Sequence, residues 1–442
     1  MSGSTVRVRS AVRNAVQGEE SMLSQRDLTI GERPSPAAET GLVLRTLSGE
    51  LLGAAERLVG FPGNLAFDDA DCGHLLSHFI NNVGDPDSDD AAGTHTKRFE
   101  RAVLAWFTGL AQGDPDGTYG YVTGGGTEGV IFGLYVGRRR LPHAPVYTSE
   151  AAHYSVRKAA DLLRMGLVTV PTRQDGTMDP EALGVLCRAR RDGDAAGETA
   201  ARGAVVLATA GTTMGGVFDD VTALRAAASA AGEVHVHCDA ALGGIVAAFS
   251  TPRPAWDFRD GADTISVSGH KFLGSPVPSG IVLARREMLP ELPVGEYVGA
   301  DDHTLACSRN GLAPVLLWKR LRELGTAGLR DLVHRCQATA AYAYEALAAA
   351  GARPQRWRHA LAVTFDRPPR RVCARWRLTV EGDRAQLIAM PHVTRRHVDE
   401  LVDELCAAWQ SDDEERALPA AGHGCGEGRT QDARRHRSVR PW

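Results

Sequence analysis

The sequence predicts an α/β fold with a mainly parallel sheet. Between residues 120 and 285, short runs rich in β-branched residues alternate with helical stretches. A repeated strand–helix–strand order is typical of a parallel sheet that is covered by helices. The chain has 442 residues, which is too long for one compact core, and its character becomes more helical after residue 288. We therefore expect a large α/β domain followed by a smaller α+β domain.

The individual elements follow from hydrophobic periodicity and from turn residues. Strands are expected at 144–147, 167–171, 204–208, 234–238, 264–268 and 280–284. Helices are expected at 38–59, 154–165, 221–231, 313–324, 329–350 and 395–408. The expected organisation is a poorly ordered segment over 1–37, a helical segment over 38–60, a large domain over 61–288, a small domain over 289–410 and a disordered tail over 411–442.

The composition is that of an ordinary globular protein, with 43% hydrophobic and 24% charged residues. The net charge of −4 gives no general attraction to nucleic acid or to an anionic membrane. No apolar run approaches the roughly 18 residues of a membrane span, and the N-terminus lacks the apolar region of a secretory signal. The eight cysteines form no C-x-x-C pair, which favours reduced thiols and a cytoplasmic location.

Lysine is scarce in this chain. Of 50 basic residues only four are lysine, namely Lys97, Lys158, Lys271 and Lys319. A position that keeps lysine can need an amine that loses its proton and condenses with an aldehyde, which arginine cannot do. Lys271 ends the run SVSGHK, just after an expected strand, where its side chain would reach the edge of the sheet. The ordinary alternative is a surface lysine in a turn.

A second motif, HVHCDAA, places His235, His237 and Asp239 on one face of an expected strand. One interpretation is a metal site of the form H-x-H-x-D. Another is a carboxylate at the carboxyl end of a strand that pairs with a protonated pyridine nitrogen and keeps the ring an electron sink. Asp239 could also simply cap the next helix.

The run from Gly124 to Gly129 matches G-x-G-x-x-G, and Glu150 follows at about the spacing of a ribose-binding acid. A dinucleotide site is therefore one alternative. Backbone N–H groups at a helix N-terminus bind one phosphate as readily as two, however. A cofactor with a single phosphate, a ring and an aldehyde accounts for the glycines, Asp239 and Lys271 together, whereas a dinucleotide leaves Asp239 and Lys271 unexplained.

Two further stretches add polar groups to this picture. His153 stands at the start of an expected helix, where its imidazole could stack on a flat ring, although a buried structural histidine is the commoner case. The turn GTTMGG over 211–216 follows an expected strand and offers hydroxyl groups near the same edge of the sheet.

With these residues in view, the chain resembles the group II decarboxylases that depend on pyridoxal 5′-phosphate (PLP), and within them the histidine and serine decarboxylase branch. The matching stretches are FPGNLAFDD, INNVGDP, GYVTGGGTEG, AAHYSVRKAADLLRM, AGTTMGGVFDD, HCDAALGG, SVSGHKFLGSPVPSGIV and SRNGLAPVLLW. The resemblance implies PLP fold type I, which is like aspartate aminotransferase, with a mainly parallel seven-stranded sheet and a small C-terminal domain. It also implies a homodimer or larger homo-oligomer with active sites at subunit boundaries.

The resemblance also implies roles for single residues. Lys271 matches the Schiff-base lysine, Asp239 the carboxylate at the pyridine nitrogen, and Ala241 the small residue beneath the ring. His153 matches the histidine that stacks on the ring and touches the substrate. The positions around the phosphate are Gly125, Gly126, Thr127, Ser268 and His270.

Three more residues are carried over in the same way. Thr212 is expected near the hydroxyl side of the ring. Tyr297 is expected to deliver a proton from a mobile loop, and Arg309 to reach the carboxylate end of an amino acid substrate.

The chain departs from the branch at Gly124 and Val130, where the branch usually has asparagine, and at Leu312, where it usually has histidine. Val130 and Leu312 replace polar by aliphatic side chains, and an apolar pocket discriminates against polar substrates. The hypothesis is an apolar substrate such as valine in place of histidine or serine. The alternative is that these positions lie outside the pocket.

Three rival functions stay open at this point. An aldehyde synthase couples decarboxylation to oxidation by O₂, although the presence of Tyr297 argues against it. A nicotinamide-dependent oxidoreductase would use the glycine run and Glu150. A non-catalytic homologue would have no need to retain Lys271, Asp239 and His153 together.

Overall fold

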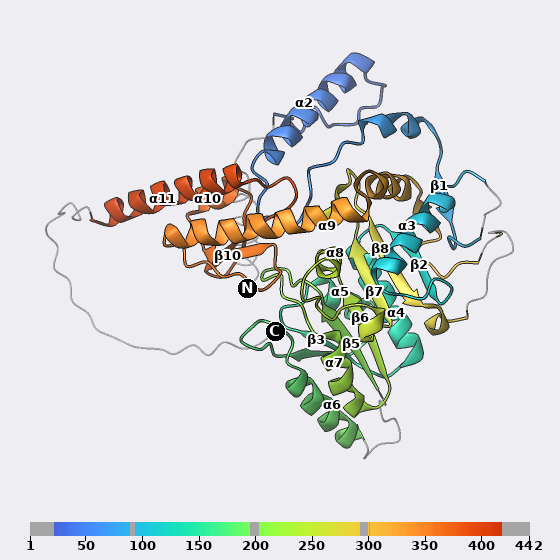
Figure 1. Ribbon diagram of the computed structural model, residues 1–442. Coiled ribbons are helices and arrows are strands. Elements are labelled where there is room, and N and C mark those ends of the chain that lie inside the picture. Colours follow the sequence, from blue (N-terminus) through green and yellow to red (C-terminus); the bar gives the residue numbers. More distant parts are fainter. Residues whose placement is uncertain (1–21, 89–92, 195–202, 292–298, 300, 418–442) are drawn as a thin grey trace, which may run out of the picture.

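The structure is a computed structural model that describes residues 22–88, 93–194, 203–291, 299 and 301–417. Within these ranges the centre of the molecule is a seven-stranded sheet of order β2-β8-β7-β6-β5-β3-β4 (Figure 1). β8 pairs antiparallel with both neighbours, and the remaining pairs are parallel. The α/β prediction is therefore confirmed. The strands are β2 (Thr118–Thr123), β3 (Val146–Ser149), β4 (Leu167–Val170), β5 (Ala204–Thr209), β6 (Val234–Asp239), β7 (Thr264–Ser268) and β8 (Gly280–Arg285).

The central strands are buried on both faces, as β5 illustrates. Val205 and Leu207 contribute to one hydrophobic cluster, whereas Val206 and Ala208 contribute to another. Successive side chains of a strand point to opposite faces, so the two clusters lie on opposite sides of the sheet. This explains why the strand runs are continuously apolar.

Helices cover both faces of the sheet. α4 and α5 belong to the cluster of Val205, whereas α3, α7 and α8 belong to the cluster of Val206. The helices of this part of the chain are α3 (Lys97–Leu110), α4 (Gly126–Arg140), α5 (Ser155–Leu162), α6 (Pro180–Asp194), α7 (Val221–Ala228) and α8 (Gly243–Ala248). Short 3-10 turns span Ala70–Ser77, Ser229–Ala231, Phe258–Asp260 and Arg286–Met288.

The C-terminal part contains long helices and a small antiparallel sheet of order β10-β12-β11. The two expected helices are the two parts of α9, which meet at a kink at Gly325 where φ is 59°. α11 continues to Ala417, beyond the expected start of the disordered tail, because its Asp, Glu, Arg and Ala residues tolerate a helix. The elements are α9 (Leu312–Ala349), β10 (Ala362–Asp366), α10 (Arg370–Arg375), β11 (Thr379–Glu381), β12 (Arg384–Ile388) and α11 (Arg395–Ala417).

The N-terminal part lies against this body with little burial. α2 (Ala37–Ala55) has no buried residue and lies at the margin of the molecule in Figure 1. It ends at Ala55, before the expected residue 59, and the Val59 N–H donates to the carbonyl of Arg57 at 3.1 Å. β1 (Asn81–Val83) pairs antiparallel with β9 (Ser308–Asn310). Across the described ranges, no helix combines the length and apolar character that crossing a membrane requires.

Candidate active site

The predicted site residues gather at one edge of the sheet. β5, β6 and β7 are parallel neighbours, and β2 runs in the same direction because β8 is antiparallel to both β2 and β7. Thr209, Asp239, Ser268 and Thr123 therefore end their strands at a common edge. In open α/β sheets this carboxyl edge is where ligands bind.

Lys271 follows β7 in a π-helical turn, His270–Gly274. Burial lowers the pKa of its amine, and the neighbouring Asp239 partly counteracts this. A lowered pKa increases the fraction of neutral amine, which is the form that condenses with an aldehyde. Lys271 thus has the environment that imine formation needs.

A residue that the sequence reasoning did not single out holds this turn in place. The buried Asn64 amide donates to the carbonyls of Phe272 and Leu273 at 2.9 and 3.0 Å. The backbone N–H of Asn64 also donates to the carbonyl of Lys271 at 3.1 Å. Asn64 belongs to the stretch FPGNLAFDD, which carried the resemblance, but nothing local in that stretch indicates this contact.

Asp239 is the buried carboxylate of the site. Burial raises its pKa, while Lys271, the Ala241 N–H and His153 act in the opposite direction. The Ala241 N–H donates to Oδ1 at 3.1 Å, and no described residue donates to Oδ2. A cationic ring nitrogen beside Oδ2 would stabilise the charged carboxylate, as the predicted pairing requires.

His153 lies just before α5, half-buried and close to both charged groups. Its Nδ1 lies 2.8 Å from Oγ of Ser155. Burial lowers its pKa, Asp239 raises it and Lys271 lowers it. The balance favours a neutral imidazole, and a neutral ring held by Ser155 can stack on a flat cofactor.

The glycine run forms the turn from β2 into α4. A Cβ atom at Gly126 would lie 2.7 Å from Oγ of Ser268 and 3.7 Å from Cβ of Ala241. A larger residue would require Ser268 to shift, whereas glycine permits this approach, which brings the N-terminus of α4 beside β7. The Gly124 N–H donates to the carboxylate of Glu128 at 2.7 Å, which shapes the turn. The first turn of α4, with Thr127, is left to bind a phosphate.

The remaining predicted cofactor residues lie on neighbouring turns. His270 places Nδ1 at 2.7 Å from the carbonyl of Ser279, and burial lowers its pKa. Thr212 is buried, and its hydroxyl accepts the Val217 N–H at 3.1 Å.

The residues on which the metal and dinucleotide alternatives depend make hydrogen bonds with other residues of the chain. His237 places Nδ1 2.9 Å from the hydroxyl of Thr264, and His235 places Nε2 3.1 Å from the carbonyl of Gly133. Among the described residues no cluster of three or more metal-binding side chains occurs. Glu150 accepts the hydroxyl of Thr172 at 2.8 Å.

Arg309 has partners other than the predicted substrate carboxylate. Its guanidinium forms a buried ion pair with Glu100 and donates to the carbonyl of Gly84 at 2.7 Å. It also lies over the ring of Tyr121, 5.3 Å from the ring centre. These contacts anchor β9 to Glu100 and Gly84, and the role of Arg309 toward a substrate carboxylate stays a prediction. Tyr297 lies outside the described residues.

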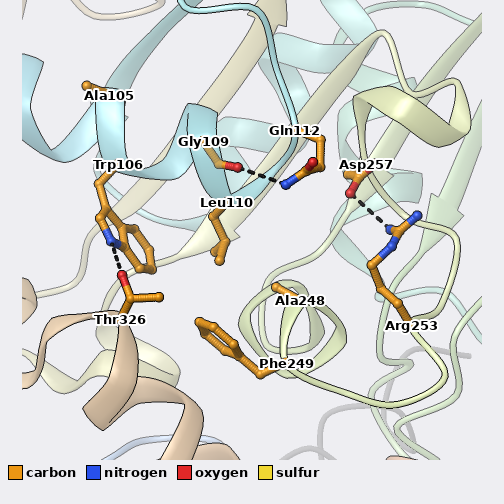
Figure 2. A pocket seen from close by; sticks show the side chains of 10 residues that line it. All are labelled: Ala105, Trp106, Gly109, Leu110, Gln112, Ala248, Phe249, Arg253, Asp257 and Thr326. Atoms are coloured by element: carbon orange, nitrogen blue, oxygen red, sulfur yellow. Dashed lines mark hydrogen bonds and ion pairs between the residues drawn. The ribbon is translucent and has the colours of Figure 1, made fainter.

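One cavity of the described chain lies away from this edge. Figure 2 shows this cavity of about 430 Å³ between α3, α8 and the kink of α9. Trp106, Leu110 and Phe249 line one side of it, and Arg253 is held by Asp257 on the other. None of the predicted site residues contributes, so the site is assigned from its chemistry and its position in the sheet.

The residues present fit PLP. A buried lysine and a buried carboxylate influence each other's pKa beside a histidine whose pKa burial lowers, and the close contact of Gly126 with Ser268 places the N-terminus of α4 beside β7. Lys271, Asp239 and His153 would hold the aldehyde carbon, the ring nitrogen and the ring face of the cofactor.

Comparison with known proteins also supports PLP as the cofactor. A model of the pyridoxal-dependent decarboxylase conserved domain matches residues 139–353. Serine decarboxylase 2 of Oryza sativa subsp. japonica is 33% identical over 403 residues, which cover 88% of this chain and 84% of that protein. Histidine decarboxylase of Pseudomonas entomophila (strain L48) is 35% identical over 373 residues, which cover 82% and 90%.

Solved structures share the fold at lower identity. L-Methionine decarboxylase from Streptomyces sp. 590, in complex with L-methionine methyl ester, has a TM-score of 0.80 at 24% identity and covers 87% of this chain and 98% of that chain. Mouse CSAD has a TM-score of 0.71 at 19% identity over 92% of this chain and 99% of its own. This likeness confirms fold type I. From the sequence relatives and the matched domain, the chain belongs to the pyridoxal-dependent decarboxylases and is a PLP-dependent amino acid decarboxylase.

Proposed function

We propose that the substrate is an L-amino acid with an apolar side chain, such as valine, which is converted to CO₂ and the primary amine. The observation that carries the proposal is Leu312, which replaces the histidine usual in the resembling branch. Leu312 is half-buried at the first position of α9. This helix packs on the Lys271 turn, since a Cβ atom at Gly269 would lie 2.7 Å from Leu317. An aliphatic side chain here leaves a polar substrate group without a hydrogen-bond partner.

The other two departures from the branch, Val130 and Gly124, support the substrate proposal less directly than Leu312. Val130 is only 1% exposed and belongs to the same core cluster as Leu134 and Val156. We therefore base the substrate proposal on Leu312 and assign the replacement of asparagine by Val130 to core packing. Gly124 is exposed at the mouth of the glycine turn, where an asparagine side chain would come close to Glu128.

The amino acids for which similar proteins are named indicate which substrates to compare. The sequence relatives are named for serine and histidine, whereas the structural neighbour from Streptomyces is named for methionine. Methionine shows that this fold accommodates an apolar side chain. Valine, leucine, methionine, histidine and serine are accordingly the amino acids to compare.

Each residue of the site has a role in the proposed reaction. Bound PLP supplies an electron sink for the breaking Cα–carboxylate bond. The Lys271 amine would hold the aldehyde carbon of the cofactor. Asp239 holds the proton on the ring nitrogen, and His153 covers the ring and limits the access of water. Tyr297 would supply the proton that Cα takes up after CO₂ leaves.

The substrate proposal is tested by kcat/KM for the five amino acids. We expect valine, leucine or methionine to exceed histidine and serine by about tenfold or more. A Leu312→His variant should shift the preference toward histidine, whereas Val130→Asn, the matched control in the core, should lower stability without changing the preference. A wild-type preference for histidine or serine would contradict the proposal, and ammonia or peroxide among the products would indicate an aldehyde synthase instead.

The anchor residue is tested separately by absorbance. The purified holoenzyme should show the visible to near-ultraviolet band of a conjugated imine, and borohydride should shift it. The Lys271→Ala variant should lack the band, whereas Lys158→Ala, on the surface of α5, should retain it. A band that persists in Lys271→Ala would place the imine on another lysine.

We further propose a cytoplasmic homodimer. The seven cysteines of the described residues are free thiols, as in a reducing compartment. Leu44, Leu47 and Leu51 form an exposed stripe on α2, spaced three and four residues apart. A second copy would bury this stripe.

A further inference from the structure

A groove outside the active site lies between the C-terminal half of α9 and the segment that leads into β10. It has a volume of about 470 Å³, and its walls include Tyr344, Glu345, Arg356 and Trp357. None of the residues assigned to the cofactor or substrate lines it. The groove therefore needs its own explanation.

Arg356 is the cation of this groove. It is half-buried, and its Nε donates to the carbonyl of Ala360 at 3.1 Å while Nη2 reaches the carbonyl of Gln337 at 3.4 Å. Its hydrogen-bond partners in the described chain are these two carbonyls, and no carboxylate of the described chain forms an ion pair with it. Burial lowers the pKa of Arg356. A partly desolvated cation without a counterion is unfavourable, and an anion in the groove would relieve this.

The groove also carries the opposite charge. Glu345 is exposed on α9 and makes no hydrogen bond or ion pair with any described residue. The aromatic rings of Tyr344 and Trp357 belong to the same wall, and Tyr344 is 36% exposed. A cation, an anion and an aromatic surface within one groove are complementary to the carboxylate, ammonium and side chain of a free amino acid.

We propose that this groove is a second amino acid site, which binds a free α-amino acid with an aromatic or large apolar side chain. Arg356 pairs with the carboxylate, Glu345 with the ammonium, and the side chain packs on Trp357. Binding here does not depend on which amino acid the active site decarboxylates.

Trp357 connects this groove to the active site. A Cβ atom at Gly215 would lie 3.2 Å from the indole ring, so Trp357 packs directly on the 211–216 turn. The same turn carries Thr212 at the edge of the cofactor site. A second cavity of about 250 Å³ is lined by both Trp357 and Val217. Because Trp357 borders both cavities, a ligand that displaces its indole would also displace the turn that carries Thr212.

The site is tested with holoenzyme that borohydride has reduced, because its Lys271 no longer exchanges with added amines. L-Phenylalanine is titrated by calorimetry, and one molecule per chain should bind. Arg356→Gln should weaken binding about tenfold to hundredfold, as expected for loss of a charged hydrogen-bonding pair. Arg358→Gln, an exposed neighbour that does not line the groove, is the matched control and should bind like wild type.

Two analogues and a second variant distinguish recognition of the carboxylate from recognition of the ammonium. 3-Phenylpropionate lacks the ammonium and phenethylamine lacks the carboxylate, so both should bind more weakly than L-phenylalanine. Glu345→Gln, which breaks no contact within the described chain, should weaken L-phenylalanine about threefold and leave 3-phenylpropionate unchanged. In wild type, titration with L-phenylalanine should change the circular dichroism of the reduced pyridoxyl group, with the same half-saturation as the calorimetric titration. The Arg356→Gln variant should show no such change over the same concentrations.

Three results would overturn the proposal. One is the absence of saturable heat at about 10 mM L-phenylalanine, where even a millimolar site is filled. Another is binding by Arg356→Gln that equals wild type in a folded variant. The third is equal affinity for L-phenylalanine and 3-phenylpropionate, which would exclude recognition of the ammonium.

Discussion

Asp239 shows how the environment of one residue sets its chemistry. Burial alone favours its protonated form, whereas Lys271 and the Ala241 N–H favour the carboxylate. In the proposed site, Asp239 would hold the proton on the ring nitrogen of PLP, and the protonated ring would supply the electron sink for decarboxylation.

An Asp239→Asn variant removes this charge and keeps the size of the side chain. We expect kcat to fall by at least about 100-fold, because an amide does not hold a proton on the ring nitrogen. PLP should stay bound through Lys271 and the glycine turn, which absorbance checks in the same samples. A variant with wild-type kcat would contradict the role of Asp239.

His235 and His237 make folding sensitive to acid. Burial lowers the pKa of each to about 3. An unfolded chain binds protons on these groups near their ordinary pKa of about 6.5, so the unfolded state gains stability as the pH falls from there toward 3. Asp219 and Asp257, whose pKa burial raises to about 6, act in the opposite direction, because below that pH the folded state takes up their protons first.

A His237→Asn variant isolates one of these groups. The free energy of unfolding of wild type, relative to the variant, should fall by about 1.4 kcal/mol for each pH unit below about 6.5. Urea unfolding at several pH values between 7 and 5 measures this difference. Asp219 and Asp257 are common to both proteins and cancel. A difference that stays constant over this range would show that His237 is not held neutral.

At the scale of elements, α4 is placed by its close contact with the sheet. A Cβ atom at Gly133 would lie 2.0 Å from Nδ1 of His237, closer than any side chain allows. The helix therefore rests directly on β6, and its N-terminus is held beside Ser268. The proposed phosphate site would therefore depend on a contact about two helical turns away.

A Gly133→Ala variant should therefore lower both stability and PLP affinity. We expect a loss of about 1–3 kcal/mol in the free energy of unfolding, as for overpacking of a core, together with weaker PLP binding. Thermal unfolding and titration of the apoenzyme with PLP measure the two effects. Gly49→Ala on α2, where the new Cβ atom meets nothing within 4 Å, is the matched control and should be neutral or slightly stabilising. Equal behaviour of the two variants would refute this account of α4.

The sequence predicted those elements and site residues whose signals are local. The apolar runs of β5, β6 and β7 are continuous, and Asp239 and Lys271 follow such runs directly. β2 was not among the expected strands, because its run TYGYVT mixes aromatic residues with glycine. The glycines of α4 at 126, 129, 133 and 137 have helical spacing, and the match to G-x-G-x-x-G concealed this second pattern.

Contacts between distant parts of the chain were not predictable from local patterns. Asn64 binds the Lys271 turn across more than 200 residues, and Arg309 binds Glu100 across a similar separation. Val130 resembled a pocket residue in the sequence, yet its helix turns it into the core. In each case the partner is defined by the topology of the sheet and not by neighbouring residues.

At the scale of the whole molecule, α2 is an incompletely packed element. Leu44, Leu47 and Leu51 are 60%, 39% and 61% exposed, whereas the described core buries most other leucines. Burying each side chain against a second copy would contribute about 1.5–3 kcal/mol. A helix with this apolar face is expected to be stable when another surface covers it.

Replacing these leucines should therefore separate the proposed dimer. In a triple variant with Leu44→Ser, Leu47→Ser and Leu51→Ser, light scattering after size exclusion should give the mass of one chain, whereas wild type should give that of two. Leu162→Ser on α5 replaces a leucine that is 64% exposed elsewhere and is the matched control, so it should leave the dimer intact. Loss of activity in the triple variant, recovered at high protein concentration, would connect the assembly to the active site. A wild-type protein that is monomeric at all concentrations would contradict the dimer, and a dimeric triple variant would place the interface on another surface.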